Sequence, residues 1–307
     1  MRAAVFNGQT IQIKKLEKPK PKDSQILIKV KAVGICGTDL AIARGYYRVT
    51  TPLILGHEFD FDCYFCNREL YTQCISRKAI GIDVDGAFAD YIAVNEYLVH
   101  QIPDNLSYKE ATFIEPLAAA YQTFKLMPID EYDKNIAIFG LGKLGLLIAQ
   151  IAKLKGLNLI LVDGSDKKLE LGRSYGAEHV INRLKIKDIP ESIKSYTKGI
   201  GADIVVDATG NENALKDIIA SCRTRGKIHI KSTHGLNVPL NITDIVVREI
   251  TIYTSRCGSF KKAIEGLRSG KINVKSLISA EYDLMEIQKA FESYGIHRDD
   301  IKTIITI

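Results

Sequence analysis

Apolar residues in the second half of the chain gather in short continuous runs, and the stretches between the runs have helical periodicity. The runs lie at 136–139, 179–181, 203–207, 227–230 and 250–253, and one more ends at Asp163. Short apolar runs bounded by polar helical stretches are typical of buried strands. Parallel neighbours need crossover connections, and right-handed crossovers place helices on both faces of a sheet. Residues 120–255 are therefore predicted to form a doubly wound parallel α/β sheet.

The first 115 residues show a different pattern, in which apolar and polar positions alternate between Gly and Pro punctuation. This alternation predicts strands with one exposed face, here at 26–33, 87–94 and 98–102. The last 40 residues combine a helix with a closing strand and have no place in a six-stranded sheet. The expected organisation is a mostly β domain at 1–119, an α/β domain at 120–255, and a return to the first domain at 256–307.

Composition restricts the class of protein, its location and its partners, but indicates no specific chemistry. The chain has 307 residues, of which 46% are hydrophobic and 25% charged, as in ordinary globular proteins of two domains. Its apolar runs are too short to span a membrane, and its first residues alternate like a strand rather than a signal peptide. We therefore expect a cytoplasmic location. The net charge of +6 is spread along the chain, which argues against a nucleic-acid or membrane partner.

A glycine-rich turn separates the run at 136–139 from the next helical stretch. It consists of Gly140, Leu141, Gly142, Lys143, Leu144 and Gly145. A G-x-G-x-x-G turn between strand and helix lets the backbone approach a pyrophosphate, and the helix N-terminus offers N–H groups to it. Asp163 ends the following strand, where a carboxylate accepts hydrogen bonds from ribose hydroxyls and repels a 2′-phosphate. The pattern predicts an NAD site; an ordinary turn with a surface aspartate is the alternative.

Potential metal ligands form a first group in the β domain. The group consists of Cys36, His57, Glu58 and Glu115. A thiolate, an imidazole and carboxylates suit tetrahedral zinc with one position open, and such a zinc acts as a Lewis acid on an alcohol oxygen. Taken singly, a buried cysteine and a loop histidine are the simpler interpretation.

A second group of potential ligands follows directly. It consists of Asp60, Cys63, Cys66 and Cys74. Two cysteines two residues apart, with a third further on, have the spacing of a zinc lobe, and a carboxylate is an acceptable fourth donor. In a reducing compartment, clustered cysteines favour a metal over disulfides, so we expect a structural zinc. Cys222 and Cys257 lack partners at ligand spacing and are expected to be packing residues.

Six motifs together resemble one family. GICGTD, LGHE, CYFC with Cys74, EPLAAA, GLGKLG and GADIVVDATG occur in the order found in the zinc-dependent medium-chain alcohol and polyol dehydrogenases, over nearly the whole chain. The resemblance implies a GroES-like catalytic domain, a Rossmann coenzyme domain, and hydride transfer from a polyol, sugar or secondary alcohol to NAD. The sequence Glu115-Pro116-Leu117 resembles the sorbitol and glucose dehydrogenase branch.

The resemblance also implies roles for individual residues. It assigns the catalytic zinc to the first ligand group, proton transfer to Thr38, and a part in catalysis to Glu58. It places Lys168, Thr209 and Arg256 near the coenzyme. Family members pair through the last strand of the coenzyme domain, which implies a homodimer or homotetramer.

Two departures from the family pattern bear on activity. The residues after Cys36, at 40–42, include no histidine to continue a proton relay. More importantly, LGHEF at 55–59 runs almost at once into DFDCYFC, where the family has further barrel strands, and a barrel without strands exposes unpaired edges. Two hypotheses follow: an active zinc-dependent dehydrogenase, or a catalytically impaired NAD-binding protein with a truncated substrate domain.

Overall fold

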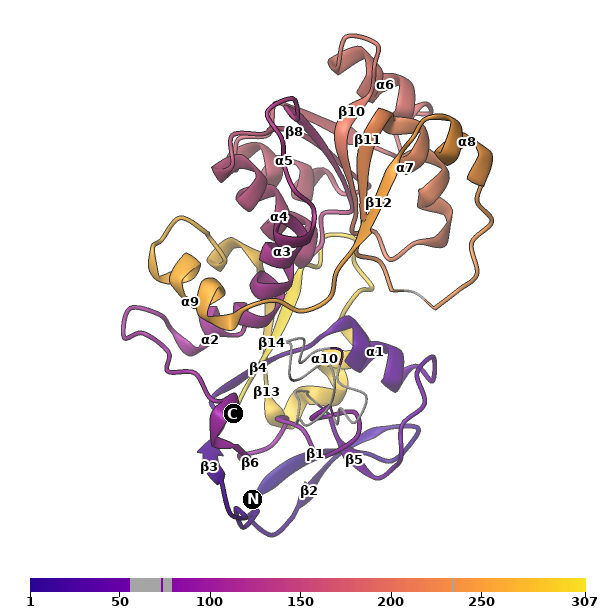
Figure 1. Ribbon diagram of the computed structural model, residues 1–307. Helices are drawn as coiled ribbons and strands as arrows, with labels where there is room; N and C mark the ends of the chain where they lie inside the picture. The colour runs from indigo at the N-terminus through magenta and orange to yellow at the C-terminus, as the bar shows by residue number, and fades with distance from the viewer. Residues whose placement is uncertain (56–72, 74–78, 234) are drawn as a thin grey trace. The chain divides into compact units, whose positions relative to one another are not determined.

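The computed structural model describes residues 1–55, 73, 79–233 and 235–307 (Figure 1). These residues form two compact units: Met1–Phe113 with Val274–Ile307, and Ile114–Asn273. The second unit extends beyond residue 255 because helix α9 (Phe260–Arg268) packs against α3 (Ile114–Leu126) within it. Six of the predicted zinc ligands lie outside the described residues: His57, Glu58, Asp60, Cys63, Cys66 and Cys74.

The second unit is built on a six-stranded parallel sheet with the order β12-β11-β10-β7-β8-β9. Its strands are β7 (Asn135–Phe139), β8 (Asn158–Asp163), β9 (His179–Asn182), β10 (Ala202–Asp207), β11 (Cys222–Ile230) and β12 (Thr251–Thr254). The strand order reverses between β10 and β7, which is the switch point where doubly wound sheets bind ligands. The predicted doubly wound parallel fold is confirmed.

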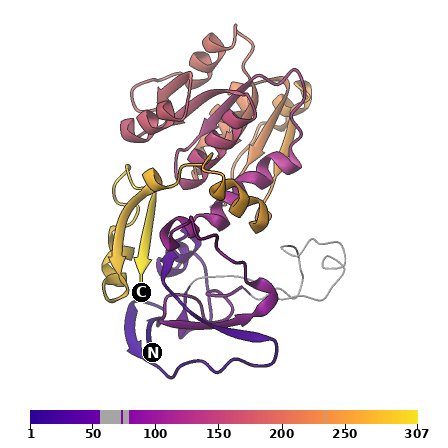
Figure 2. The same cartoon turned by 90° about the vertical axis from the view of Figure 1, so that its left-hand side faces the viewer.

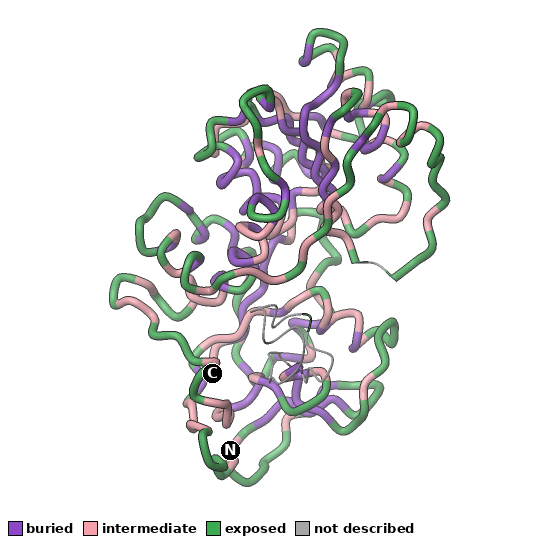
Figure 3. Tube along the Cα trace, viewed as in Figure 1, coloured by how far each residue is buried: buried purple, intermediate pink, exposed green. Residues whose placement is uncertain are grey.

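Helices cover both faces of this sheet (Figure 1). They are α3, α4 (Lys143–Leu154), α5 (Asp166–Ser174), α6 (Ile189–Tyr196), α7 (Leu215–Ser221), α8 (Ile242–Val247) and α9. Ile193 of α6 and Ile218 of α7 pack on the sheet with Phe139 and Val205, so these two helices share one face. Figure 3 shows that buried residues concentrate in the strands and in the helix sides that face them. This is the pattern that the continuous apolar runs predict.

The described residues of the first unit form three small sheets. One has the order β2 (Ile11–Lys15), β1 (Arg2–Phe6), β5 (Leu53–Ile54); another pairs β3 (Gln25–Lys29) with β6 (Tyr91–Asn95); the third has the order β13 (Ile278–Asp283), β14 (Lys302–Thr306), β4 (Ala32–Gly34). Figure 2 shows β13 and β14 as the yellow pair of strands near the C-terminus. The helices are α1 (Gly37–Ala43), α2 (Tyr108–Ala111) and α10 (Ile287–Ser293). Ile35, Phe88, Phe291 and Ile305 belong to one core cluster, which joins the C-terminal segment to the N-terminal one.

Two strand predictions for this unit are wrong. The stretch 26–33 is divided between β3 and β4, which belong to different sheets, and Val30 between them donates its N–H to the carbonyl of Asp90. The stretch 98–102 forms no strand. A 3₁₀ turn occupies Glu96–Leu98, and an irregular segment leads into Pro103. Alternation over so few residues does not determine a strand when a turn and a proline bound it.

Charged side chains tie the amino ends of the central strands together. Asp203 accepts hydrogen bonds from the backbone N–H of Asn135 (2.8 Å) and from Nε of Arg223 (2.6 Å). The Asp133 carboxylate, which is 0% exposed, pairs with Nζ of Lys227 at 2.5 Å and with Arg223 at 3.5 Å. Because a buried carboxylate is costly without its partners, these pairs hold β7, β10 and β11 in register at this edge.

We predict that Asp133→Asn lowers the free energy of unfolding of this unit by about 3 kcal/mol, since the substitution removes the 0% exposed carboxylate that pairs with both Lys227 and Arg223. Asp130→Asn is the matched control, because Asp130 contacts the same Lys227 ammonium (2.7 Å) while 50% of its side chain is exposed. The control should lose less than about 1 kcal/mol. Urea unfolding followed by circular dichroism measures the free energy of unfolding of both variants. Equal losses in the two would contradict a special role for the buried Asp133 carboxylate.

Candidate functional site

The glycine turn after β7 brings three backbone segments close together. Gly140 has a φ of +88°, and a Cβ there would lie 2.6 Å from the carbonyl oxygen of Ala208. A Cβ on Gly145, in the first turn of α4, would overlap the carbonyl oxygen of Gly140. A Cβ on Gly142, by contrast, would meet nothing within 4 Å. Two of the glycines are therefore required by packing, and the third leaves open space above the turn.

The open space lies at the N-terminus of α4. Gly142 is the N-cap of this twelve-residue helix, and no side chain caps it. The N–H groups in the first turn of a helix lack intrahelical partners, and the helix dipole adds partial positive charge there. An anion such as a pyrophosphate therefore fits this turn.

Asp163 lies beside the turn, at the end of β8. Its Oδ2 accepts a hydrogen bond from the N–H of Leu141 (2.7 Å), and its Oδ1 accepts one from the N–H of Ser165 (2.9 Å). A carboxylate has further lone pairs, so the half-buried side chain retains acceptor capacity for ribose hydroxyls. Lys168 follows in α5, where it is 8% exposed and its N–H donates to Oγ of Ser165 (3.1 Å).

The turn after β10 is fixed next to the glycine turn. Oδ1 of Asp207 accepts hydrogen bonds from the N–H (3.0 Å) and the hydroxyl (2.7 Å) of Thr209, and the N–H of Gly210 donates to Oγ of Ser232 (2.8 Å). The structure thus brings the glycine turn, Asp163 and Thr209 together at the carboxyl ends of β7, β8 and β10. This arrangement fits a bound dinucleotide.

A polar cluster that the sequence did not reveal lies at the ends of β11 and β12. It consists of His229, Lys231 and Ser255. Nε2 of His229 lies 2.9 Å from Oγ of Ser255, to which Nζ of Lys231 donates at 2.8 Å. The ammonium also donates to the backbone carbonyls of Ser255 (3.0 Å), Ala119 (3.1 Å) and Arg256 (3.3 Å). The only signal in the sequence is a lysine that directly follows a buried strand.

Burial determines the charge of this cluster. It lowers the pKa of His229 to about 4, so the imidazole is neutral near pH 7. It lowers the pKa of Lys231 to about 8, an effect that Cys257 and Glu115 partly oppose, so the ammonium is still mostly protonated at neutral pH. Among the described residues, Nδ1 of His229 has no hydrogen-bond partner. The positive charge of the cluster therefore resides on Lys231 alone.

The described part of the first ligand group is divided between the two units. Cys36 is the N-cap of α1, where its N–H donates to Oδ2 of Asp39 (2.8 Å), and its sulfur lies 3.9 Å from Oγ1 of Thr38. Glu115 is exposed at the start of α3 in the second unit. The described residues alone contain no group of three metal-ligating side chains. The thiol and carboxylate are nevertheless donors that suit zinc together with an imidazole.

Cys222 behaves as a packing residue. Its side chain is buried, and burial raises the pKa of its thiol to about 12. A thiol that stays protonated is unreactive and binds metal poorly. This agrees with the expectation that Cys222 packs in the core.

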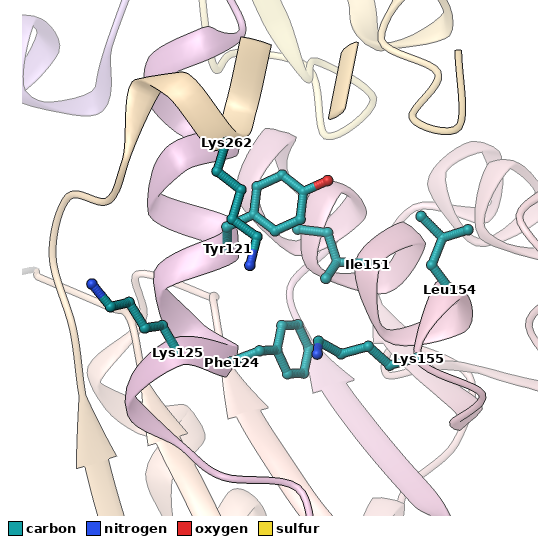
Figure 4. Close-up of a pocket in the computed structure, with 7 residues that line it drawn as sticks. All are labelled: Tyr121, Phe124, Lys125, Ile151, Leu154, Lys155 and Lys262. Carbon is teal, nitrogen blue, oxygen red and sulfur yellow. The ribbon is translucent and has the colours of Figure 1, made fainter. Parts of the chain in front are cut away.

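A hollow of about 290 Å³ lies at the far end of α4 from the glycine turn (Figure 4). Lys155 lies over the ring of Phe124, and Lys262 lies over the ring of Tyr121. Since α4 has twelve residues at about 1.5 Å each, this hollow lies some 18 Å from the proposed phosphate-binding turn and is no part of the proposed coenzyme site.

Among the described residues, no helix is long and apolar enough to cross a membrane.

Comparisons with known proteins agree with this geometry. Residues 144–269 match the zinc-binding dehydrogenase family, and residues 22–60 match the alcohol dehydrogenase GroES-like domain. Sorbitol dehydrogenase of Bacillus subtilis (strain 168) is 35% identical over 333 residues, covering 95% of this chain and 93% of the relative. D-arabitol-phosphate dehydrogenase of Enterococcus avium is 30% identical over 325 residues, covering 94% and 92%.

A solved structure shows the same fold. It is a zinc-binding dehydrogenase from Sinorhizobium meliloti 1021 bound to NADP, with 26% identity and a TM-score of 0.91 over 100% of this chain and 99% of that chain.

The alignment length also shows that this chain is shorter than the relative. The alignment with the Bacillus subtilis enzyme has 333 positions and covers 95% of this 307-residue chain, about 292 residues, so that relative carries about 41 residues without a counterpart here. Despite this difference, the match extends over both domains. The chain belongs to the zinc-dependent medium-chain alcohol and polyol dehydrogenase family, and is an oxidoreductase that acts on CH–OH groups with zinc and NAD as cofactors.

Proposed function

We propose that this chain transfers a hydride from the carbinol carbon of a polyol, sugar or secondary alcohol to NAD. The observation that carries the proposal is the convergence of the glycine turn, Asp163 and Thr209 at one edge of the sheet. Relatives named for sorbitol and D-arabitol phosphate support a polyhydroxylated substrate. Bound NAD supplies the hydride acceptor, and the protein supplies position and charge.

The coenzyme contacts that we propose all come from the second unit. The N-terminus of α4 holds the pyrophosphate, and Asp163 accepts hydrogen bonds from the adenosine ribose. Lys168 contacts the same ribose, and Thr209 and Arg256 lie along the remainder of the dinucleotide. The residues of the glycine turn are Gly140, Leu141, Gly142, Lys143, Leu144 and Gly145.

The catalytic residues that we propose come mainly from the first unit. Cys36, His57, Glu58 and Glu115 would hold a zinc, whose Lewis acidity lowers the pKa of the substrate hydroxyl. Thr38 accepts the hydroxyl proton at Oγ1 as its own hydroxyl proton leaves to water, since residues 40–42 offer no titratable group. Asp60, Cys63, Cys66 and Cys74 would hold a second, structural zinc.

A catalytically impaired NAD-binding protein is the second candidate, and the residues missing relative to the Bacillus subtilis enzyme favour it. The two candidates differ in turnover but not in coenzyme binding. Metal content and NAD reduction over a panel of polyols, sugars and secondary alcohols distinguish them. Zinc-loaded protein that reduces NAD with one of these substrates, and stops after chelation, supports the active enzyme. Tight NADH binding without turnover on any substrate supports the impaired form.

We also propose that the protein is a cytoplasmic homodimer or homotetramer. Support comes from β12, an edge strand of the six-stranded sheet on which Thr251 and Ile252 are exposed. An unpaired strand edge is a ready surface for pairing with a second copy of the chain. Light scattering gives the assembly size.

Asp163 should control the preference for NADH over NADPH. We predict that Asp163→Asn weakens NADH binding and lowers the ratio of the NADPH to the NADH dissociation constant about tenfold, because the charge that repels a 2′-phosphate is removed. Glu170→Gln, at a 79% exposed side chain of α5, should leave the ratio unchanged. Fluorescence titrations with both coenzymes measure the ratio; an unchanged ratio in Asp163→Asn would remove Asp163 from the coenzyme site.

Thr38 should affect turnover and not coenzyme binding. We predict that Thr38→Ala lowers kcat about 100-fold, the usual contribution of a positioned proton-transfer group. Thr38→Ser retains the hydroxyl and should stay within about tenfold of the wild type. Steady-state kinetics with the best substrate of the panel, together with NADH titrations, give both quantities. Equal losses in the two variants would show that the hydroxyl is not required.

A further inference from the structure

Lys231 lies at the edge of the sheet where the nicotinamide half of the coenzyme belongs. It directly follows β11, and its N–H donates to the carbonyl of Asp207 at the end of β10 (2.9 Å). The hydroxyl oxygen of the adjacent Ser232 accepts a hydrogen bond from the N–H of Gly210, in the turn after β10. In doubly wound sheets, each half of a dinucleotide lies over the carboxyl ends of one set of strands. Because Asp163 assigns the adenosine to the end of β8, we expect the nicotinamide to lie over the ends of β10 and β11.

The distances agree with this placement. β11 is two strands from β7, which is about 10 Å at the usual strand spacing. The pyrophosphate belongs at the glycine turn that follows β7. A nicotinamide nucleotide that extends from there across β10 therefore ends close to Lys231.

The ammonium of Lys231 is held only by neutral groups. Its four acceptors are the hydroxyl and carbonyl of Ser255 and the carbonyls of Ala119 and Arg256. Within the part of the chain that the structure describes, no carboxylate lies within 4.0 Å of it, although Cys257 and the more distant Glu115 interact with its charge. The neighbouring imidazole of His229 is fully buried. A half-buried cation without a counter-ion acts on its surroundings more strongly than a solvated lysine.

The two redox forms of the coenzyme differ in the charge of one ring. The nicotinamide of NAD⁺ carries a positive charge, and the hydride that converts it to NADH neutralises that charge. A fixed cation nearby therefore repels the ring of NAD⁺ and leaves that of NADH unaffected.

We infer that Lys231 makes this coenzyme domain bind NADH in preference to NAD⁺, so that bound NAD⁺ is easier to reduce than free NAD⁺ and the oxidation of an alcohol is favoured on the protein. The inference rests on the proposed NAD-dependent function and adds to it the direction of hydride transfer that the bound coenzyme favours. We expect the Lys231 charge to change the ratio of the two dissociation constants about tenfold, which corresponds to about 30 mV in the potential of a two-electron couple.

The alternative is that Lys231 serves only a structural role, in which its hydrogen bonds connect β11 to α3 and to the segment after β12. Loss of a structural lysine weakens the binding of NAD⁺ and NADH alike or lowers the stability of the protein, and does not change the ratio of the two dissociation constants. The ratio of the NAD⁺ to the NADH dissociation constant therefore separates the two roles.

The experiment compares Lys231→Met, Lys231→Arg and Lys155→Met in the full chain. NADH is titrated by its own fluorescence, since the chain contains no tryptophan, and NAD⁺ is measured by displacement of NADH. Lys231→Met should lower the NAD⁺/NADH ratio of dissociation constants about tenfold, mainly through tighter NAD⁺ binding. Lys231→Arg keeps the charge and should keep the ratio. Lys155→Met removes an exposed charge at the far end of α4 and should also keep it.

A second measurement needs no variant. In the wild type, NAD⁺ should bind no more tightly than ADP-ribose, which lacks the nicotinamide, whereas NADH should bind more tightly than both. Equal affinities for NAD⁺ and NADH in the wild type, or an unchanged ratio in Lys231→Met, would overturn the inference while leaving NAD binding intact. A wild type that binds none of the three ligands would instead overturn the proposed function.

Discussion

The close approach of backbone segments at the glycine turn is the constraint on which the coenzyme domain depends. Gly145 lies against the carbonyl of Gly140, and Gly140 lies against the backbone of Ala208. Side chains at these two glycines would push α4 away from β7 and β7 away from β10. Asp163 then fixes the turn by its hydrogen bond from Leu141. These contacts leave space beside Gly142 at the N-terminus of α4, where we propose that the pyrophosphate binds.

The two ends of the sheet use charge in opposite ways. At the amino end, Asp133 and Asp203 are neutralised by Lys227 and Arg223, so that the charges stabilise the fold. At the carboxyl end, no side chain caps the N-terminus of α4, and Lys231 is held by neutral acceptors. Ionisable groups in perturbed environments cluster at functional sites. The carboxyl end is therefore where we propose that the coenzyme binds, in agreement with the strand order.

The sequence predicted the coenzyme half well, because buried parallel strands are continuous apolar runs and the glycine turn is a local motif. The prediction for 98–102 failed because a short alternation does not distinguish a strand from the irregular segment before Pro103. The cluster around Lys231 was missed for another reason: its partners Ala119 and Ser255 are distant in sequence and meet only across the folded sheet. The catalytic ligand set is read from motifs, since His57 and Glu58 lie outside the described residues.

The central claim is that a hydride moves from the carbinol carbon of a substrate to NAD on this chain. The most direct measurement uses zinc-loaded protein, NAD⁺ and a polyol deuterated at its carbinol carbons, with mass spectrometry of the coenzyme formed. The account predicts reduced coenzyme that carries one deuterium from the substrate. Reduced coenzyme without deuterium, or none with any polyol, sugar or secondary alcohol, would contradict it.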